Sequence, residues 1–191
     1  MENNAFKVET DITKKLQLPD LVHGIKVAEL SVKLAEYCNL NIDYKKLYIS
    51  GALHDIGKAY LHENILNNPG RLTNKEYLHI KNHCRYGAQV CLAIGFDYDI
   101  VKSVLYHHEN FDGSGYPKGL KGNEIPIIAR ILRICDVYCA LTTKRAYRNG
   151  KTNIEAIEIM EREKRFYDPD LYNVFLEMIN KDQLVKVNRK N

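Results

Sequence analysis

The sequence predicts an all-α protein, and three observations carry this prediction. Helical periodicity and helix-capping residues recur along the chain, whereas strand-like alternation around a hairpin turn does not. The composition is that of a globular protein, with 45% hydrophobic and 27% charged residues. At 191 residues the chain suits a single bundle of about seven helices.

The first two predicted helices follow an N-terminal arm, residues 1–17. From Pro19 to Cys38, apolar residues recur with the i, i+3, i+4, i+7 spacing of an amphipathic helix. Asp43 can cap a second helix, and Gly57 supplies the backbone freedom that would end it.

Two more helices and a long loop are predicted in the middle of the chain. Thr73 followed by Glu76 is a capping box, which predicts a third helix that ends at Gly95. A fourth helix is expected over residues 97–108. Residues 109–125 contain four glycines and a proline, so they are predicted to form a loop. Long loops in compact domains are often functional.

Three helices are predicted in the C-terminal third. The first covers residues 126–141, Thr152 caps the second, and Pro169 occupies the first position of the last. Because no repeat or low-complexity linker divides the chain, residues 18–180 are expected to form one domain, followed by a polar tail of residues 181–191.

Charge and cysteine usage exclude several classes of protein. The 28 Lys and Arg exceed the 24 Asp and Glu without forming a basic run, so neither a nucleic-acid polymer nor a membrane is an expected partner. The five cysteines include no C-x-x-C pair and fit reduced thiols. Since the chain shows no signal-peptide core and no long apolar window, we expect a cytoplasmic protein.

Histidines and aspartates form the candidate site. The pairs His54-Asp55 and His107-His108 fall at predicted helix ends, where consecutive side chains can converge. Imidazole and carboxylate together suit iron, manganese, nickel or zinc. One ion would take His23, His54, Asp55 and Asp136, and a second would share Asp55 and take His83, His107 and His108.

A lone histidine is more often a core or surface residue than a ligand. His62 and His79 lack polar company of this kind, so we expect both to be exposed to solvent. The paired residues differ, because burying them without partners would cost several kcal/mol that metal coordination removes.

The charge of such a centre indicates its chemistry. Two divalent ions, two carboxylates and one bridging hydroxide leave a net charge of about +1, which attracts a phosphodiester and stabilises its transition state. No nucleophilic serine or cysteine motif is recognisable, so metal-activated water is the expected nucleophile.

Five motifs in this order resemble the HD-GYP branch of the HD-domain phosphohydrolases. They are HDIGK at 54–58, NNPGRLTNKE at 67–76, HHENFDGSGYP at 107–117, IPIIARILRICD at 125–136 and RAYR at 145–148. The resemblance covers roughly residues 18–175 and implies an all-helical fold with two or three metal ions, often iron or manganese. It also implies hydrolysis of cyclic di-GMP.

Carried over residue by residue, the resemblance assigns the metal ligands His23, His54, Asp55, His83, His107, His108 and Asp136. It assigns catalysis to Asp55 and Lys58, with the Lys58 ammonium also facing the substrate phosphate. Arg145 and Arg148 match a phosphate-facing pair, and Tyr116 is expected to shape the pocket wall. Plainer interpretations also exist: Lys58, Arg145 and Arg148 could be solvated charges, and Tyr116 could be part of an ordinary glycine-rich turn.

Two positions depart from the family pattern. Pro19 stands where some members have a glutamate that helps to hold a third ion, so we expect two divalent ions. Iron or manganese is expected first, with zinc, nickel or cobalt as alternatives. Cys139 replaces a common aspartate near the substrate, which leaves rate and substrate identity open.

Three functions remain open at this point. The first is a cyclic di-GMP phosphodiesterase that forms linear pGpG, and GMP if a second step follows, by attack of a metal-bridging hydroxide. The second is a phosphohydrolase of the same type that acts on another cyclic dinucleotide or a nucleotide. The third is a non-catalytic domain that senses a dinucleotide or docks a signalling protein through the Gly115–Pro117 loop. A homodimer is also left open.

Overall fold

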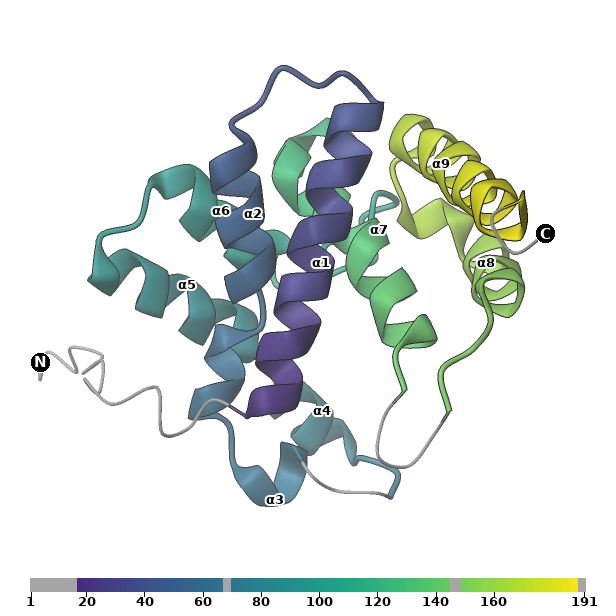
Figure 1. Ribbon diagram of the computed structural model, residues 1–191. Helices are drawn as coiled ribbons and strands as arrows, with labels where there is room; N and C mark the ends of the chain where they lie inside the picture. The colour runs from purple at the N-terminus through teal and green to yellow at the C-terminus, as the bar shows by residue number, and fades with distance from the viewer. Residues whose placement is uncertain (1–16, 67–69, 145–148, 189–191) are drawn as a thin grey trace, which may run out of the picture.

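The computed structural model describes residues 17–66, 70–144 and 149–188, with side chains up to residue 181. These residues form nine α-helices and short 3-10 turns, without a strand among them, so the all-α prediction is confirmed (Figure 1). Two predicted substrate contacts, Arg145 and Arg148, lie outside the described residues, as do residues 1–16 of the predicted arm.

The first two predicted helices are present. Helix α1 (Leu18–Tyr37) has its proline in the first turn, and α2 (Tyr44–Leu53) begins at Asp43, whose carboxylate accepts the backbone N–H groups of Lys45 and Lys46. Figure 1 shows the two helices packed side by side, and they are the most extensively contacting pair.

The prediction that Gly57 ends the second helix is wrong. Helix α2 already ends at Leu53, and Gly57 lies inside the 3-10 helix η2 (Ile56–Tyr60). A Cβ at Gly57 would lie 1.9 Å from the carbonyl oxygen of His83. The glycine is therefore needed for the close approach of η2 to α5 (His83–Ile94).

The single helix predicted from Thr73 to Gly95 is two helices, α4 (Asn74–Lys81) and α5. Both predicted ends are confirmed: the capping box is formed, and Gly95 ends α5 at a φ of 89°. The chain breaks at Asn82 because the two halves pack differently: α4 buries none of its residues, whereas α5 is buried along one face. A short helix, α3 (Glu63–Leu66), was not predicted.

The remaining helices match their predictions closely. They are α6 (Tyr98–Tyr106), α7 (Ile127–Thr142), α8 (Asn153–Arg162) and α9 (Pro169–Asn188). The predicted loop 109–125 is irregular apart from one 3-10 turn, η3 (Gly122–Glu124). Helix α9 continues past residue 180, where the polar tail was expected to begin.

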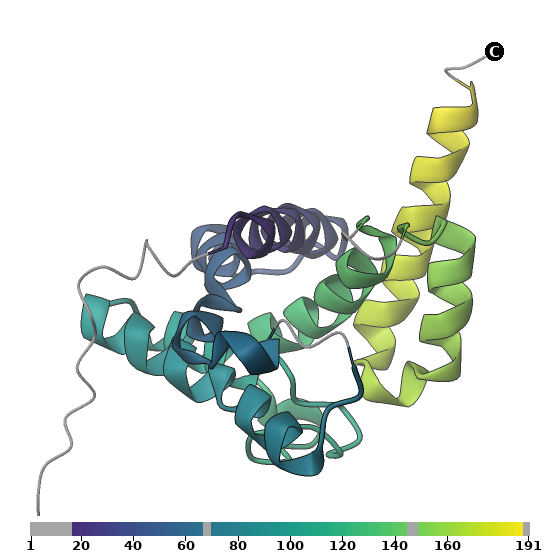
Figure 2. The ribbon, with the colours of Figure 1, turned by 90° about the horizontal axis from the view of Figure 1, so that it is seen from below.

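The apolar side chains form two clusters. The larger joins α1 and α7 to α8 and α9, and it includes Leu34, Ile131 and Phe175; the smaller joins η2, α5 and α6. Figure 2 shows α8 and α9 on one side of α7 and α5 on the other. Within the described part of the chain, no helix combines the length and apolarity that a membrane crossing requires.

Candidate metal centre

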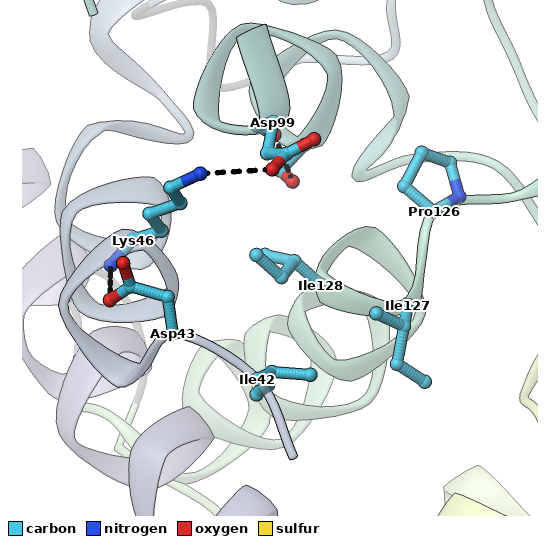
Figure 3. A pocket seen from close by; sticks show the side chains of 8 residues that line it. Ile42, Asp43, Lys46, Asp99, Pro126, Ile127 and Ile128 are labelled. Atoms are coloured by element: carbon cyan, nitrogen blue, oxygen red, sulfur yellow. Dashed lines mark hydrogen bonds and ion pairs between the residues drawn. The ribbon is translucent and has the colours of Figure 1, made fainter. Parts of the chain in front are cut away.

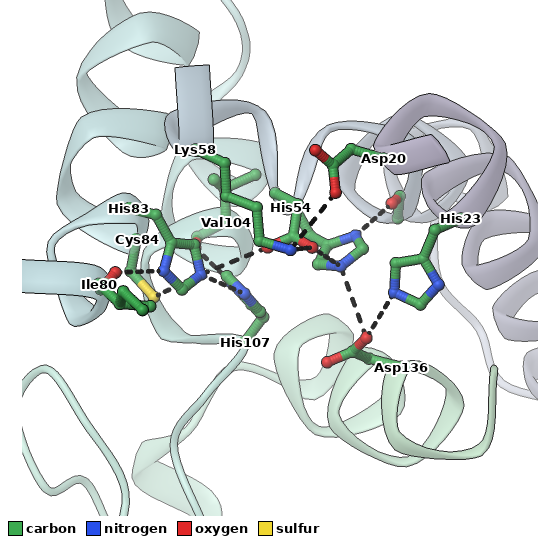
Figure 4. A network of polar contacts seen from close by, with 12 residues as sticks. Asp20, His23, His54, Lys58, Ile80, His83, Cys84, Val104, His107 and Asp136 are labelled. Atoms are coloured by element: carbon green, nitrogen blue, oxygen red, sulfur yellow. Dashed lines mark hydrogen bonds and ion pairs between the residues drawn. The ribbon is translucent and has the colours of Figure 1, made fainter. Parts of the chain in front are cut away.

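Five elements of the fold bring together all seven predicted metal ligands. Helix α1 supplies His23, the end of α2 supplies His54-Asp55, α5 begins with His83, the end of α6 supplies His107-His108, and α7 supplies Asp136. His54 and His107 are the C-terminal cap residues of their helices, as predicted. Figure 4 shows most of these side chains converging between the helices.

One local hydrogen bond orients three of the histidines. In His54, His83 and His107, Nδ1 lies 2.7 Å from the carbonyl oxygen of the residue three positions earlier. A carbonyl only accepts hydrogen bonds, so Nδ1 carries a proton in all three rings and Nε2 is the nitrogen that is left to face the centre. The ends of the helices therefore orient three rings so that a metal can bind through Nε2.

The carboxylate of Asp55 lies between two groups of histidines: the first is His23 and His54, and the second is His83, His107 and His108. Its Oδ2 is 3.2 Å from Nε2 of His54, and its Oδ1 is 3.4 Å from Nε2 of His83. Nε2 of His107 lies 3.2 Å from Nε2 of His83. One carboxylate thus offers a separate oxygen to each group, which is the geometry of a bridging ligand.

Asp136 completes the first group. Its Oδ1 lies 2.8 Å from Nε2 of His23 and 3.7 Å from Nε2 of His54. Both carboxylates are nearly buried, with exposed fractions of 8% each.

Electrostatics keep most of these groups in their metal-binding forms. Burial would raise the pKa of Asp55 and Asp136, but Lys58 and His54 hold the pKa of Asp55 well below its usual value, and contacts with His23 and His54 do the same for Asp136. Burial lowers the pKa of His107 well below its usual value and that of His108 to about 3, so both rings are neutral at physiological pH. Burial also disfavours charge on His54, but Asp55 and Asp136 more than offset this and raise its pKa to about 10.

The residues fit a bound cation. Nε2 of His54 is fully buried and makes no hydrogen bond within the described residues, although Oδ2 of Asp55 lies 3.2 Å and Oδ1 of Asp136 3.7 Å away. Leaving such an atom without a partner costs free energy. A divalent ion between His54, Asp55 and Asp136 would satisfy it.

Lys58 and Tyr116 lie beside this centre. Nζ of Lys58 is 2.6 Å from Oδ2 of Asp55 and 3.6 Å from Oδ1 of Asp20. Burial opposes charge on Lys58, but these carboxylates raise its pKa, so the ammonium stays charged. The ring of Tyr116 lies 4.9 Å from that of His108.

The two histidines outside the predicted ligand set, His62 and His79, lie apart from this cluster. The His62 and His79 rings stack on each other at 5.0 Å, and neither belongs to a cluster of ligand atoms. His62 is exposed as expected, but His79 is only half-exposed, because this stacking covers part of its ring.

Sequence reasoning missed three side chains near the centre. Asp20 contacts Lys58, the Cys84 thiol lies against His83, and Arg133 donates from Nε to Asn110 in the loop. Asp20 and Arg133 each lie three residues from a predicted ligand on the same helix, a spacing that could have revealed them. Cys139, in contrast, packs in the larger apolar cluster.

A separate hollow has no part in this centre. A cleft of about 240 Å³ lies between α2, α6 and the start of α7, where Lys46 pairs with Asp99 at 3.0 Å (Figure 3). None of the predicted site residues that the structure describes lines it. Its shape therefore says nothing about the chemistry of the histidines.

Comparisons with known proteins agree with this arrangement. Residues 21–171 match the family described as HD domain. A 3'3'-cGAMP-specific phosphodiesterase of Vibrio cholerae is 43% identical over 143 residues, which are 74% of this chain and 33% of that protein. A cyclic di-GMP phosphodiesterase of Pseudomonas aeruginosa is 36% identical over 160 residues, which are 83% of this chain and 39% of that protein.

A solved structure shares the fold. An HDG"Y"P protein from Bdellovibrio bacteriovorus has a TM-score of 0.67 at 22% identity, with 91% of this chain and 55% of that chain covered. The chain spans about a third to two fifths of the length of the two curated relatives above.

Proposed function

The chain belongs to the HD-GYP group of the HD-domain family, and on this premise we propose that it is a metal-dependent phosphodiesterase that hydrolyses cyclic di-GMP. The HDIGK and HHENFDGSGYP motifs and the convergence of the seven candidate ligands support this function. The linear dinucleotide pGpG is the proposed product.

The position of Asp55 carries the proposal. Because its two oxygens face different histidine groups, we propose that it bridges two ions. His23, His54 and Asp136 would complete one site, and His83, His107 and His108 the other. Nitrogen and oxygen ligands of this kind suit iron or manganese.

The side chains of the protein have distinct roles in this reaction. Bound ions supply water activation and neutralise charge on the phosphate. Asp55 and Asp136 would hold the ions, and the charged Lys58 ammonium, held beside Asp55, would stabilise the negative charge that develops on the phosphate. Tyr116 offers a ring face at the wall, where a nucleobase can stack. Arg145 and Arg148 are proposed to bind the second phosphate.

A second substrate has support of its own. The relative that is 43% identical is named for 3'3'-cGAMP, so this hybrid dinucleotide is the main alternative. The replacement of the usual aspartate by Cys139 adds to the case for testing it. A non-catalytic role, with the Gly115–Pro117 loop as a docking site for a signalling protein, is the remaining alternative.

Anaerobic loading of the purified chain with Fe(II) or Mn(II) tests these functions together. We expect two ions per chain and turnover of cyclic di-GMP, with pGpG separated by chromatography. A panel with 3'3'-cGAMP and cyclic di-AMP would show which dinucleotide has the highest kcat/KM. Asp55→Asn should lose both metal and activity, whereas His62→Ala should keep both. Metal uptake without turnover of any dinucleotide would favour the docking role, and failure to bind a transition metal would refute the mechanism.

A further inference from the structure

The proposed ligand set does not account for a buried thiol at the centre. Cys84 follows His83 in the first turn of α5 and is fully buried. Its sulfur lies 3.5 Å from Nε2 of His83 (Figure 4). One ligand atom each from His83, Cys84, His107 and His108 lie within 4.8 Å of one another.

We propose that Cys84 is a thiolate ligand of the ion held by His83, His107 and His108. This inference rests on the metal centre of the proposed function and adds a fifth protein ligand, a thiolate, to the site that the three histidines would share with Asp55.

The distances favour this ligand set. Around one ion with a metal–sulfur distance near 2.3 Å, metal–nitrogen distances near 2.05 Å and angles of about 109° between ligands, the sulfur and a nitrogen lie about 3.6 Å apart, and two nitrogens about 3.3 Å apart. The corresponding separations here are 3.5 Å between Cys84 and His83 and 3.2 Å between His83 and His107. These two separations therefore already match those of ligands around one ion, and the ligand atom of His108 lies within 4.8 Å of the others.

The surroundings of the thiol also favour coordination. Cys91, which follows Cys84 by two helical turns, packs into the smaller apolar cluster, as a structural thiol is expected to do. Cys84 belongs to neither apolar cluster, although it is equally buried. The neighbouring Nε2 atom of His83 offers a lone pair, since Nδ1 of that ring donates its proton to the carbonyl oxygen of Ile80. As a ligand, Cys84 would lose its S–H proton to solvent, and its sulfur and Nε2 of His83 would both face the ion.

A thiolate changes which metal this site selects. Thiolate and imidazole favour zinc, cobalt or ferrous iron over manganese, which prefers oxygen ligands. The two ions would then differ in kind: the site of His23, His54 and Asp136 has two carboxylates and suits a harder ion, while the site with Cys84 retains a softer one.

Cobalt(II) tests the proposal through its absorption spectrum. Thiolate coordination gives a thiolate-to-cobalt charge-transfer band in the near ultraviolet, which nitrogen and oxygen ligands do not produce. We expect this band in the parent chain and in Cys91→Ala, the matched control from the same helix, and its loss in Cys84→Ala. The zinc affinity of Cys84→Ala should fall by more than the roughly 10- to 100-fold that loss of an outer-shell partner costs.

The outcomes separate the two proposals. Cobalt bound without the band in the parent, or a band that survives in Cys84→Ala, refutes ligation by Cys84 and leaves the phosphodiesterase proposal intact. A parent that binds no cobalt, zinc, iron or manganese refutes the metal centre and both proposals with it. If Cys84→Ala does not fold, X-ray absorption of the zinc-loaded parent decides: a sulfur neighbour at about 2.3 Å supports the proposal, and its absence overturns it.

Discussion

Replacing Gly57 by alanine should separate the two halves of the metal centre. The added Cβ would lie 1.9 Å from the carbonyl oxygen of His83 and 2.5 Å from the backbone nitrogen of Gly87. Both obstacles are backbone atoms, so a side-chain rotation cannot relieve the clash. Since real Cβ contacts are essentially never shorter than 3.0 Å, η2 and α5 must move apart by about 1.1 Å.

That movement acts directly on two candidate ligands. Asp55 precedes Gly57 by two residues, and His83 begins α5. Their atoms Oδ1 and Nε2, now 3.4 Å apart, would separate to about 4.5 Å, whereas ligands that share one ion lie about 3.4 Å apart. We expect Gly57→Ala to lose at least one of the two ions.

Metal analysis after anaerobic loading, combined with thermal unfolding, measures both effects. Overpacking should cost about 1–3 kcal/mol and lower Tm by about 2–12 °C. Gly95→Ala is the control: it destabilises the chain through its positive φ, by roughly 1 kcal/mol, but its Cβ meets nothing within 4 Å. Gly95→Ala should keep its metal. If Gly57→Ala binds two ions with parental affinity and unfolds at the parental Tm, the close approach of η2 to α5 is not what positions these ligands.

Three further predictions follow from the contacts around the centre. Because the pKa of His54 is raised to about 10, the ring is protonated at pH 7 and must lose that proton to bind metal. Metal affinity should therefore rise with pH up to about 10. Titration calorimetry in buffers of different ionisation enthalpy should detect the released proton, and a binding heat that does not depend on the buffer would contradict this prediction. His62→Ala should leave metal content unchanged, because the His62–His79 stack lies outside the ligand cluster; loss of an ion in a metal analysis would place that pair in the centre after all. Glu109→Ala should lower the free energy of unfolding, measured in urea, by about 2–4 kcal/mol, because the buried carboxylate accepts hydrogen bonds from the backbone N–H groups of Lys118, Gly119 and Leu120. The variant should keep its metal. An unchanged free energy of unfolding would show that these bonds do not hold the loop.

Local sequence signals located the elements and the helix ends that bear ligands. The cap at Asp43, the capping boxes at Thr73 and Thr152, and the glycine end at Gly95 are short-range features, and each is formed as predicted. The break at Asn82 could not be predicted in this way. The apolar pattern is nearly continuous across it, and only tertiary packing distinguishes the buried α5 from the exposed α4.

The convergence of the candidate ligands was accessible from the sequence for a similar reason, whereas the surrounding side chains were not. His54-Asp55 and His107-His108 are pairs at helix ends, so their convergence is partly local. Cys84 follows His83 directly, but this is no such sign, since Cys135 neighbours Asp136 in the same way and packs in the larger apolar cluster. The significance of Cys84 depends on the approach of α6 to α5, which brings His107 within 3.2 Å of His83.

Gly51 shows how packing and ligand orientation are coupled in this fold. Its carbonyl accepts the Nδ1–H of His54, which directs Nε2 of that ring into the centre. Its missing side chain also lets α1 approach, because a Cβ there would lie 2.7 Å from Cα of Ala28. Helix α1 carries His23, whose ring centroid lies 5.4 Å from that of His54. One glycine therefore sets both the direction of one candidate ligand and its distance from another, so the same helix contact that buries apolar surface between α1 and α2 also fixes the geometry of the metal centre.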